Sequence, residues 1–189
     1  TLDQSIQPAD ATAAAPSNHI FYGQDDGGKL AFVFPGQGNQ YLNMGKDLTC
    51  FFPEAMETIQ SADQCLGWKL PLSQHIFPLP DDSPEAPQDQ MQRLLQTEIA
   101  QPAIGASSMA MLKILERFDI KPDITAGHSY GELVALYAAG WINHQTLFRL
   151  SKARGQAMAA AGKQHPGVMT AVQTPIATLE SLVDTLADV

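Results

Sequence analysis

Cysteine is scarce in this chain, which has only Cys50 and Cys65 among its 189 residues. Two cysteines form neither a disulfide framework nor the paired spacing of a zinc site. Such usage is typical of a reducing compartment and favours a cytoplasmic location. The N-terminal residues also lack a basic stretch followed by an apolar one, so no secretory signal is recognisable.

Basic residues and long apolar runs are also lacking. The chain has 11 Lys and Arg against 20 Asp and Glu, a formal net charge of -9. A protein this acidic is a poor candidate for nonspecific nucleic-acid binding, which depends on neutralising phosphates. No apolar run is long enough to cross a bilayer. The hydrophobic content of 44% is nevertheless enough for a substantial core.

The pattern along the chain alternates between strands and helices. Residues 1–28 are rich in Ala, Pro, Ser, Asp and Gly without periodicity, which predicts a flexible linker. The pattern predicts strands at 30–34, 124–126 and 167–172, and helices at 44–66, 90–96, 102–118, 133–139, 144–161 and from 174 onward. Strands alternating with helices predict an α/β fold, a mostly parallel sheet flanked by helices.

The most informative motif is Gly-His-Ser-Tyr-Gly-Glu at 127–132, between a predicted strand and a predicted helix. Gly-x-Ser-x-Gly at such a junction presents a serine oxygen at the tip of a tight turn. The following helix directs its N-terminal N–H groups toward a developing oxyanion. The motif therefore predicts acyl transfer through Ser129. Glu132 is expected to act only through the charge of the first helical turn, not as an acid or base.

Two glycine-containing segments raise the alternative of nucleotide binding. Gly36 and Gly38 would need a third glycine at position 41 for a dinucleotide fingerprint, and Tyr41 stands there. A phosphate loop at 45–47 would need Ser or Thr at its end, where the chain has Asp47. Both nucleotide interpretations fail at the residues that carry their mechanism.

Four motifs in order carry a resemblance to a known family. They are Phe-Pro-Gly-Gln-Gly-Asn-Gln-Tyr at 34–41, Glu-Ile-Ala-Gln-Pro-Ala at 98–103, the serine motif at 127–132, and Ser-Lys-Ala-Arg-Gly-Gln at 151–156. Together they resemble the malonyl-CoA:acyl-carrier-protein transacylases and the acyltransferase domains of polyketide synthases. The second and third motifs are most similar to iterative synthases of the polyunsaturated-fatty-acid type. Asn39 departs from the serine usual in the first motif.

The resemblance implies a role for each site residue. Ser129 would attack an acyl-CoA thioester and hold the acyl group as an ester. The backbone N–H groups of Gln37 and Tyr130 would form the oxyanion hole. Arg154 would bind the free carboxylate of a malonyl-type group, for which a planar guanidinium is suited. Substrate binding would also involve two further residues, Gln101 and His128.

The same resemblance implies the cofactors and partners. CoA enters only as the thioester substrate, and neither a bound cofactor nor a metal is expected. The acyl group would pass to the phosphopantetheine thiol of an acyl carrier protein, among the other domains of a megasynthase.

The resemblance also implies the domain division. Residues 29–163 would form the N-terminal part of a hydrolase-like core, and residues 164–189 would begin a ferredoxin-like subdomain. The family's catalytic histidine lies well downstream of its serine, and neither His144 nor His165 stands in that motif. The chain is therefore expected to be a C-terminally truncated acyltransferase domain, with little activity by itself.

Two other functions stay open at this stage. A serine esterase or thioesterase could use the same serine turn, although Arg154 argues against it because simple acyl esters carry no carboxylate. A non-catalytic scaffold domain of a synthase could retain Ser129 as a vestige. Tyr130 occupies a variable position that the family associates with substrate choice, but it does not identify a substrate.

Overall fold

A computed structural model describes residues 27–81, 83–164, 167 and 172–186 of the chain. In this part the sheet has two parallel strands, β1 (Ala31–Phe34) and β2 (Ile124–Gly127), with Ala31 opposite Ile124 and Phe34 opposite Gly127. The expectation of an α/β fold with a parallel sheet flanked by helices is confirmed at this level. The predicted strand at 167–172 lies largely outside the described residues.

The other described elements are helices, which follow β1 and β2 along the sequence. The first four are α1 (Lys46–Phe51), α2 (Pro53–Leu66), α3 (Leu72–Ile76) and α4 (Ala86–Leu95). The others are α5 (Thr97–Arg117), α6 (Gly131–Ala138), α7 (His144–Gln164) and α8 (Ile176–Leu186). The helix predicted at 44–66 is therefore two helices, because Phe52 takes an extended conformation before Pro53.

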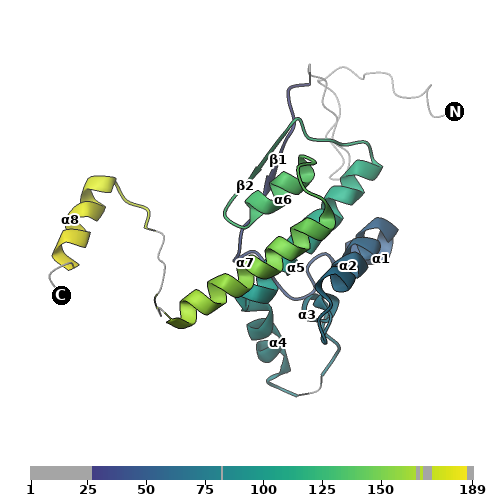
Figure 1. Cartoon of the computed structure of the whole chain (residues 1–189), viewed down its shortest axis with the longest axis horizontal. Coiled ribbons are helices and arrows are strands. Elements are labelled where there is room, and N and C mark those ends of the chain that lie inside the picture. Colours follow the sequence, from purple (N-terminus) through teal and green to yellow (C-terminus); the bar gives the residue numbers. More distant parts are fainter. Residues whose placement is uncertain (1–26, 82, 165–166, 168–171, 187–189) are drawn as a thin grey trace, which may run out of the picture.

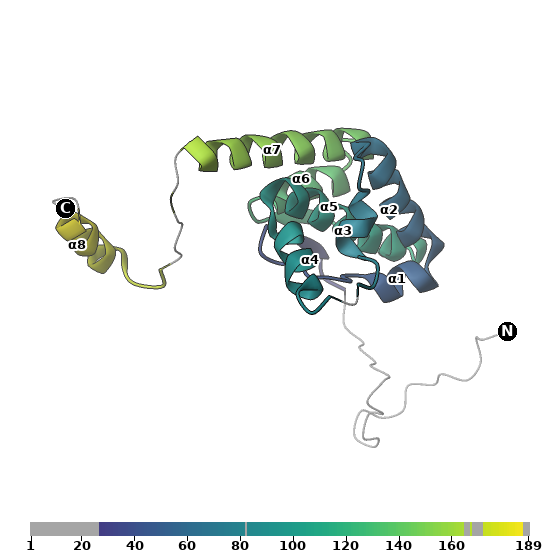
Figure 2. The ribbon, with the colours of Figure 1, turned by 90° about the horizontal axis from the view of Figure 1, so that it is seen from below.

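Helix α5 forms the centre of the molecule. In Figure 2, α7 spans the top of the view with α5 and α6 beneath it. The predicted start of α5 at Pro102 is wrong, since the helix begins five residues earlier at Thr97. Pro102 lies in the helix interior, where it removes one backbone hydrogen bond, yet it is completely buried. Packing of α5 on its neighbours thus outweighs the local signal.

Helix ends follow the sequence signals more closely elsewhere. Asn143, a residue type favoured before a helix, caps α7 by accepting a hydrogen bond from the Thr146 N–H at 2.9 Å. Gly140 has a φ of 77°, a left-handed conformation that suits the residue after α6. Helix α8 lies apart from the other elements in both views (Figures 1 and 2).

The sheet is covered on one face only within the described residues. Phe34 is buried, whereas Val33 is 73% and Ile124 is 52% exposed. An apolar strand such as 30–34 is typical of a sheet covered on both faces, and here only one face is covered by described residues. Helices α5 and α6 cover the side that Phe34 faces, and a cleft of about 330 Å³ lies between β1 and α5. No described helix is long and apolar enough to cross a membrane.

Candidate active site

The candidate nucleophile Ser129 lies directly beyond the carboxyl end of β2. Because β1 and β2 are parallel and in register, the segments that follow Phe34 and Gly127 leave the sheet at the same edge. The His128 N–H donates a hydrogen bond to the Phe34 carbonyl at 3.1 Å, which holds the two segments together. Ser129 has a φ of 54°, a strained left-handed conformation for a residue other than glycine. The predicted serine turn is therefore present.

Small residues are required where the two segments meet. A methyl group on Gly131 would overlap the carbonyl group of Phe34, and one on Gly127 would overlap the backbone of Gly131. A methyl group on Gly36 would lie 2.6 Å from the His128 carbonyl oxygen and 3.3 Å from the Ser129 Cβ. These approaches explain in physical terms why glycines flank the serine. They also place the segment carrying Gln37 next to the nucleophile.

The N-terminus of α6 supplies the electrostatics of the turn. The helix begins at Gly131, and Glu132 lies exposed in its first turn, as predicted. The N–H groups of Gln37 and Tyr130 have no hydrogen-bond acceptor within the part of the chain that the structure describes. Free N–H groups beside a nucleophile are what an oxyanion hole requires.

Arg154 reaches the serine from α7. Its Nη2 lies 3.4 Å from the Ser129 Oγ, although the two residues are 25 positions apart. Its Nη1 is buried and has no hydrogen-bond partner among the described residues. A buried guanidinium nitrogen without an acceptor is costly, and a carboxylate is the ligand that matches it best. The structure thus brings the predicted nucleophile and the predicted carboxylate-binding residue together.

Gln101 and Gln37 connect α5 to the same site. Gln101 is completely buried, and its Nε2 lies 3.4 Å from the Gln37 Oε1 and 3.2 Å from the Met158 sulfur. Gln37 in turn donates from Nε2 to the Thr97 Oγ1 at 3.1 Å. The Gln101 Oε1 is buried without a described partner, so it is available to accept a hydrogen bond. The sequence interpretation did not identify Thr97 and Met158, which no motif singles out.

The two described histidines after β2 differ in position. His128 is exposed and lies beside Gly36, at the rim of the serine turn. His144 is the first residue of α7, ten residues and about 15 Å along the helix from Arg154. It lines a surface cleft with Lys113 and Tyr137 instead. His165 lies outside the described residues.

The side chain of Tyr130 points into the protein. It is completely buried, and its hydroxyl lies 2.6 Å from the Ser151 Oγ on α7. Burial raises the pKa of Tyr130 well above its ordinary value, while the hydrogen bond to Ser151 and the charge of Arg154 oppose this. Sequence reasoning missed Ser151, because a lone serine within a helix carries no local signal of its partner.

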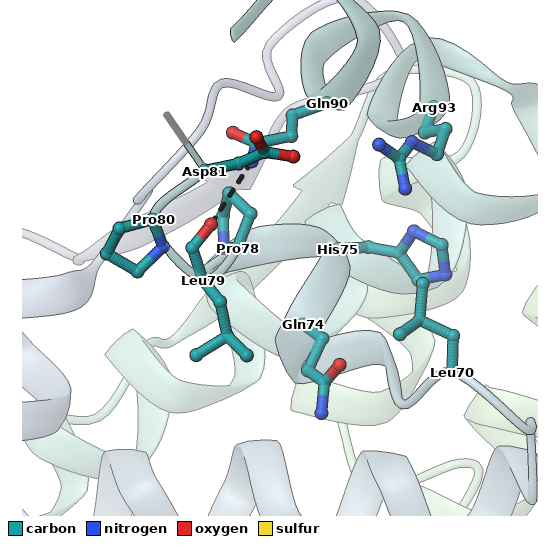
Figure 3. Close-up of a pocket in the computed structure, with 9 residues that line it drawn as sticks. All are labelled: Leu70, Gln74, His75, Pro78, Leu79, Pro80, Asp81, Gln90 and Arg93. Atoms are coloured by element: carbon teal, nitrogen blue, oxygen red, sulfur yellow. Dashed lines mark hydrogen bonds between the residues drawn. The ribbon is translucent and has the colours of Figure 1, made fainter. Parts of the chain in front are cut away.

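A separate cavity of about 240 Å³ lies between α3 and α4 (Figure 3). Its polar side chains include His75, Arg93 and Gln90, and Gln90 donates a hydrogen bond to the Leu79 carbonyl at 3.2 Å. None of the candidate acyl-transfer residues lines this cavity. Ser129 itself is exposed rather than enclosed. Within the described ranges, no three His, Cys, Asp or Glu side chains gather to hold a metal ion.

Comparison with known proteins agrees with this arrangement. The family described as acyl transferase domain matches residues 31–187. A malonyl CoA-acyl carrier protein transacylase from Bacillus subtilis is 38% identical over 144 residues, covering 76% of this chain and 42% of the relative. Polyketide synthase GfsA from Streptomyces halstedii is 39% identical over 164 residues, covering 84% of this chain and 2% of the synthase.

A solved structure gives the same result. It is a malonyl-transacylase in complex with the acyl-carrier protein of a type II polyketide synthase, which is 34% identical to this chain with a TM-score of 0.62. The match covers 71% of this chain and 40% of that one. The chain thus spans less than half the length of the transacylases it matches. From the serine turn, the arginine beside it and these similarities, the chain belongs to the acyl transferase domain family.

Proposed function

We propose that this chain contributes the nucleophile and the carboxylate-binding arginine of a malonyl-type acyltransferase in polyketide or fatty acid biosynthesis. The observation that carries the proposal is Arg154, which has one nitrogen 3.4 Å from the Ser129 Oγ and another buried without a described partner. A carboxylate bound there would occupy the unpaired nitrogen and keep the rest of the acyl group near the serine.

The first half-reaction loads the enzyme. The Ser129 oxygen bonds to the thioester carbonyl carbon, the carbon–sulfur bond breaks, and CoA leaves as its thiol. The N–H groups of Gln37 and Tyr130 stabilise the negative charge on the carbonyl oxygen. The serine proton passes through a general base to the leaving sulfur. We expect that base to be the downstream histidine that the resemblance implies, since His144 is distant from Arg154 along α7.

The second half-reaction returns the serine to its free form. The phosphopantetheine thiol of an acyl carrier protein attacks the serine ester and gives its proton to the general base. The carbon–oxygen bond breaks, the base returns the proton to the Ser129 oxygen, and the malonyl group leaves on the carrier. An acyl carrier protein is seen bound to the solved transacylase, and the match covers only 2% of the polyketide synthase GfsA, which supports a carrier protein and other synthase domains as partners. Neither step needs a metal or a bound cofactor, and we expect the enzyme to act in the cytoplasm.

The wider architecture is part of the same proposal. We infer that residues 29–163 belong to a larger hydrolase-like core, and that residues 164–189 begin a ferredoxin-like subdomain. The exposed side chains of Val33 and Ile124 support the first inference, because an apolar sheet face is normally covered. The exposure of Ser129 fits a site that further chain would enclose.

The test uses the full-length protein that carries this chain. Incubation with radiolabelled malonyl-CoA should leave label on the peptide containing Ser129, and Ser129→Ala should abolish it. Arg154→Ala should lower the rate of malonyl loading at least tenfold while acetyl loading falls less, because only malonyl carries the second carboxylate. Equal loss for both thioesters would refute the assigned role of Arg154.

The same experiment separates the two alternatives. An esterase would hydrolyse neutral esters rapidly and trap no malonyl group, an outcome that would sink the transfer reaction. A scaffold domain would bind carrier protein equally well with Ser129→Ala and show no acylation. The guanidinium of Arg154 beside the nucleophile, with its Nη1 buried and unpaired among the described residues, favours transfer of a carboxylate-bearing group over both.

A further inference from the structure

The residue after the nucleophile is bonded to the helix that carries Arg154. Tyr130 and Ser151 are both completely buried, and their oxygens are 2.6 Å apart. The Ser151 Oγ also lies 2.7 Å from the Leu147 carbonyl, which can only accept, so the serine proton is directed there. The Tyr130 hydroxyl must therefore donate to Ser151. The result is a series of two hydrogen bonds, in which Tyr130 donates to Ser151 and Ser151 donates to the backbone of α7.

The middle member of this series of hydrogen bonds, Ser151, lies one helical turn from Arg154. Ser151 and Arg154 are three residues apart on α7, and side chains at that spacing lie on one side of a helix. Tyr130 is covalently next to Ser129, whose φ of 54° leaves its side chain at the tip of the turn. The Tyr130–Ser151 bond thus joins the neighbour of the nucleophile to the turn before the arginine. Sliding of α7 along α6 would change the 2.6 Å Tyr130–Ser151 distance together with the 3.4 Å distance from Arg154 to Ser129.

Close packing on α5 fixes both ends of the connection. A methyl group on Gly105 would overlap the Tyr130 hydroxyl, so the tyrosine ring lies directly against the α5 backbone. A methyl group on Gly155, next to Arg154, would lie 2.7 Å from the Glu98 Cα. Helix α5 therefore leaves no space into which the tyrosine or this turn of α7 could shift.

We propose that Tyr130 and Ser151 are a positioning pair that sets the distance between Arg154 and Ser129, and through it the preference for carboxylate-bearing acyl groups. The proposal rests on the malonyl-transfer function above and adds residues that determine its specificity. Neither side chain touches the substrate. Their effect should therefore fall on substrates that use Arg154 and spare those that do not.

The test compares malonyl-CoA with acetyl-CoA in the full-length protein. Tyr130→Phe keeps the ring and removes only the donor, and Ser151→Ala removes the acceptor. For each variant, the kcat/KM for Ser129 loading is measured with both thioesters. We expect the malonyl-to-acetyl ratio to fall about twofold to tenfold, the range for one neutral hydrogen bond. In Ser151→Ala, whose residue takes no part in the oxyanion hole, loading with acetyl-CoA should stay within about twofold of wild type, since acetyl makes no demand on the arginine.

A matched control is Tyr137, at the opposite end of α6 from Tyr130. Tyr137, near the C-terminal end of α6, packs with the Lys113 Nζ 5.8 Å from its ring centre and lines the surface cleft with Lys113 and His144. Tyr137→Phe should leave the ratio unchanged. An unchanged ratio in both Tyr130→Phe and Ser151→Ala, or an equal loss for both thioesters, would overturn the positioning role. If wild-type protein forms no malonyl ester at Ser129, the proposed function itself is refuted, and this role with it.

Discussion

At the scale of single residues, the site depends on backbone contacts that exclude side-chain atoms. Ser129 has a conformation that L-residues rarely adopt, and Gly131 lies against the carbonyl of Phe34. The side chains at this site can therefore act only if the backbone segments that follow Phe34 and Gly127 fit closely together. A nucleophile of the right type at position 129 would be ineffective if its neighbours held the segments apart.

Gly131→Ala tests this close fit. The added methyl group would overlap the Phe34 carbonyl, so either β1 or the start of α6 must move. We expect unfolding by urea to show a loss of at least about 2 kcal/mol in stability, as for other overpacked sites. The matched control is Gly28→Ala, where a methyl group would meet nothing within 4 Å. Equal stability of the two variants would contradict the described contact.

At the scale of elements, the Tyr130–Ser151 bond is directional, and this makes its two ends unequal. When Tyr130 becomes Phe, Ser151 keeps its bond to the Leu147 carbonyl at 2.7 Å and no buried polar group is stranded. When Ser151 becomes Ala, the Tyr130 hydroxyl remains completely buried without its acceptor. Unsatisfied buried groups cost more than lost hydrogen bonds.

The expected outcome is an asymmetric mutant cycle. Ser151→Ala should lower the free energy of unfolding by about 1–3 kcal/mol, and Tyr130→Phe by about 0.5–1.5 kcal/mol. The double variant should be no less stable than Ser151→Ala alone, because it removes the stranded hydroxyl. Urea unfolding of the four proteins measures this. Additive losses in the double variant would show that the two hydroxyls do not interact.

The elements predicted from the sequence differ in how well local signals determined them. Asn143 and Gly140 fix helix ends through their own hydrogen bonds or φ values, so both ends were predictable. Pro102 predicts a helix start, because a proline in the first turn sacrifices no hydrogen bond. In the structure, burial of α5 on several neighbours extends the helix past it. Tertiary contacts of that kind leave no local pattern in the sequence.

The site was predictable for a different reason. Ser129 and Gln37 follow strands, and parallel strands bring their carboxyl ends to one edge whatever the intervening sequence. Arg154 required the family resemblance, because 25 residues and a helix crossing separate it from the serine. Ser151 was missed because a lone serine in a helix carries no signal until its partner's direction is known. In this chain, topology was easier to predict than side-chain partners.

At the scale of the whole molecule, the described fold is well packed around α5 and open at the sheet. The core includes large fully buried side chains such as Tyr130 and Phe148, whereas Val33 and Ile124 face outward. Stability therefore comes chiefly from the helices, while the strands mainly position the two segments of the site.

The stability of this helical part should depend on pH through His75. Its pKa is lowered by burial and then by the charge of Arg93, with Asp63 opposing them. The side chains of His75 and Arg93 both line the cavity between α3 and α4 (Figure 3). The folded state holds this pKa below its ordinary value. At pH values between the folded and the unfolded pKa of His75, the unfolded chain therefore binds more protons than the folded one. The contribution of neutral His75 is thus complete above about pH 6.5 and is lost as the pH falls below it.

Two variants test the origin of this dependence. His75→Gln removes the titrating group, so the loss of unfolding free energy between about pH 7.5 and pH 5 should be smaller than in wild type. Arg93→Gln keeps the histidine but removes one cause of its lowered pKa, so its pH dependence should lie between the other two. Urea unfolding across this pH range measures each slope, and NMR titration reports the His75 pKa directly. A slope in His75→Gln equal to that of wild type would place the pH dependence in other groups, because a residue that cannot titrate contributes none.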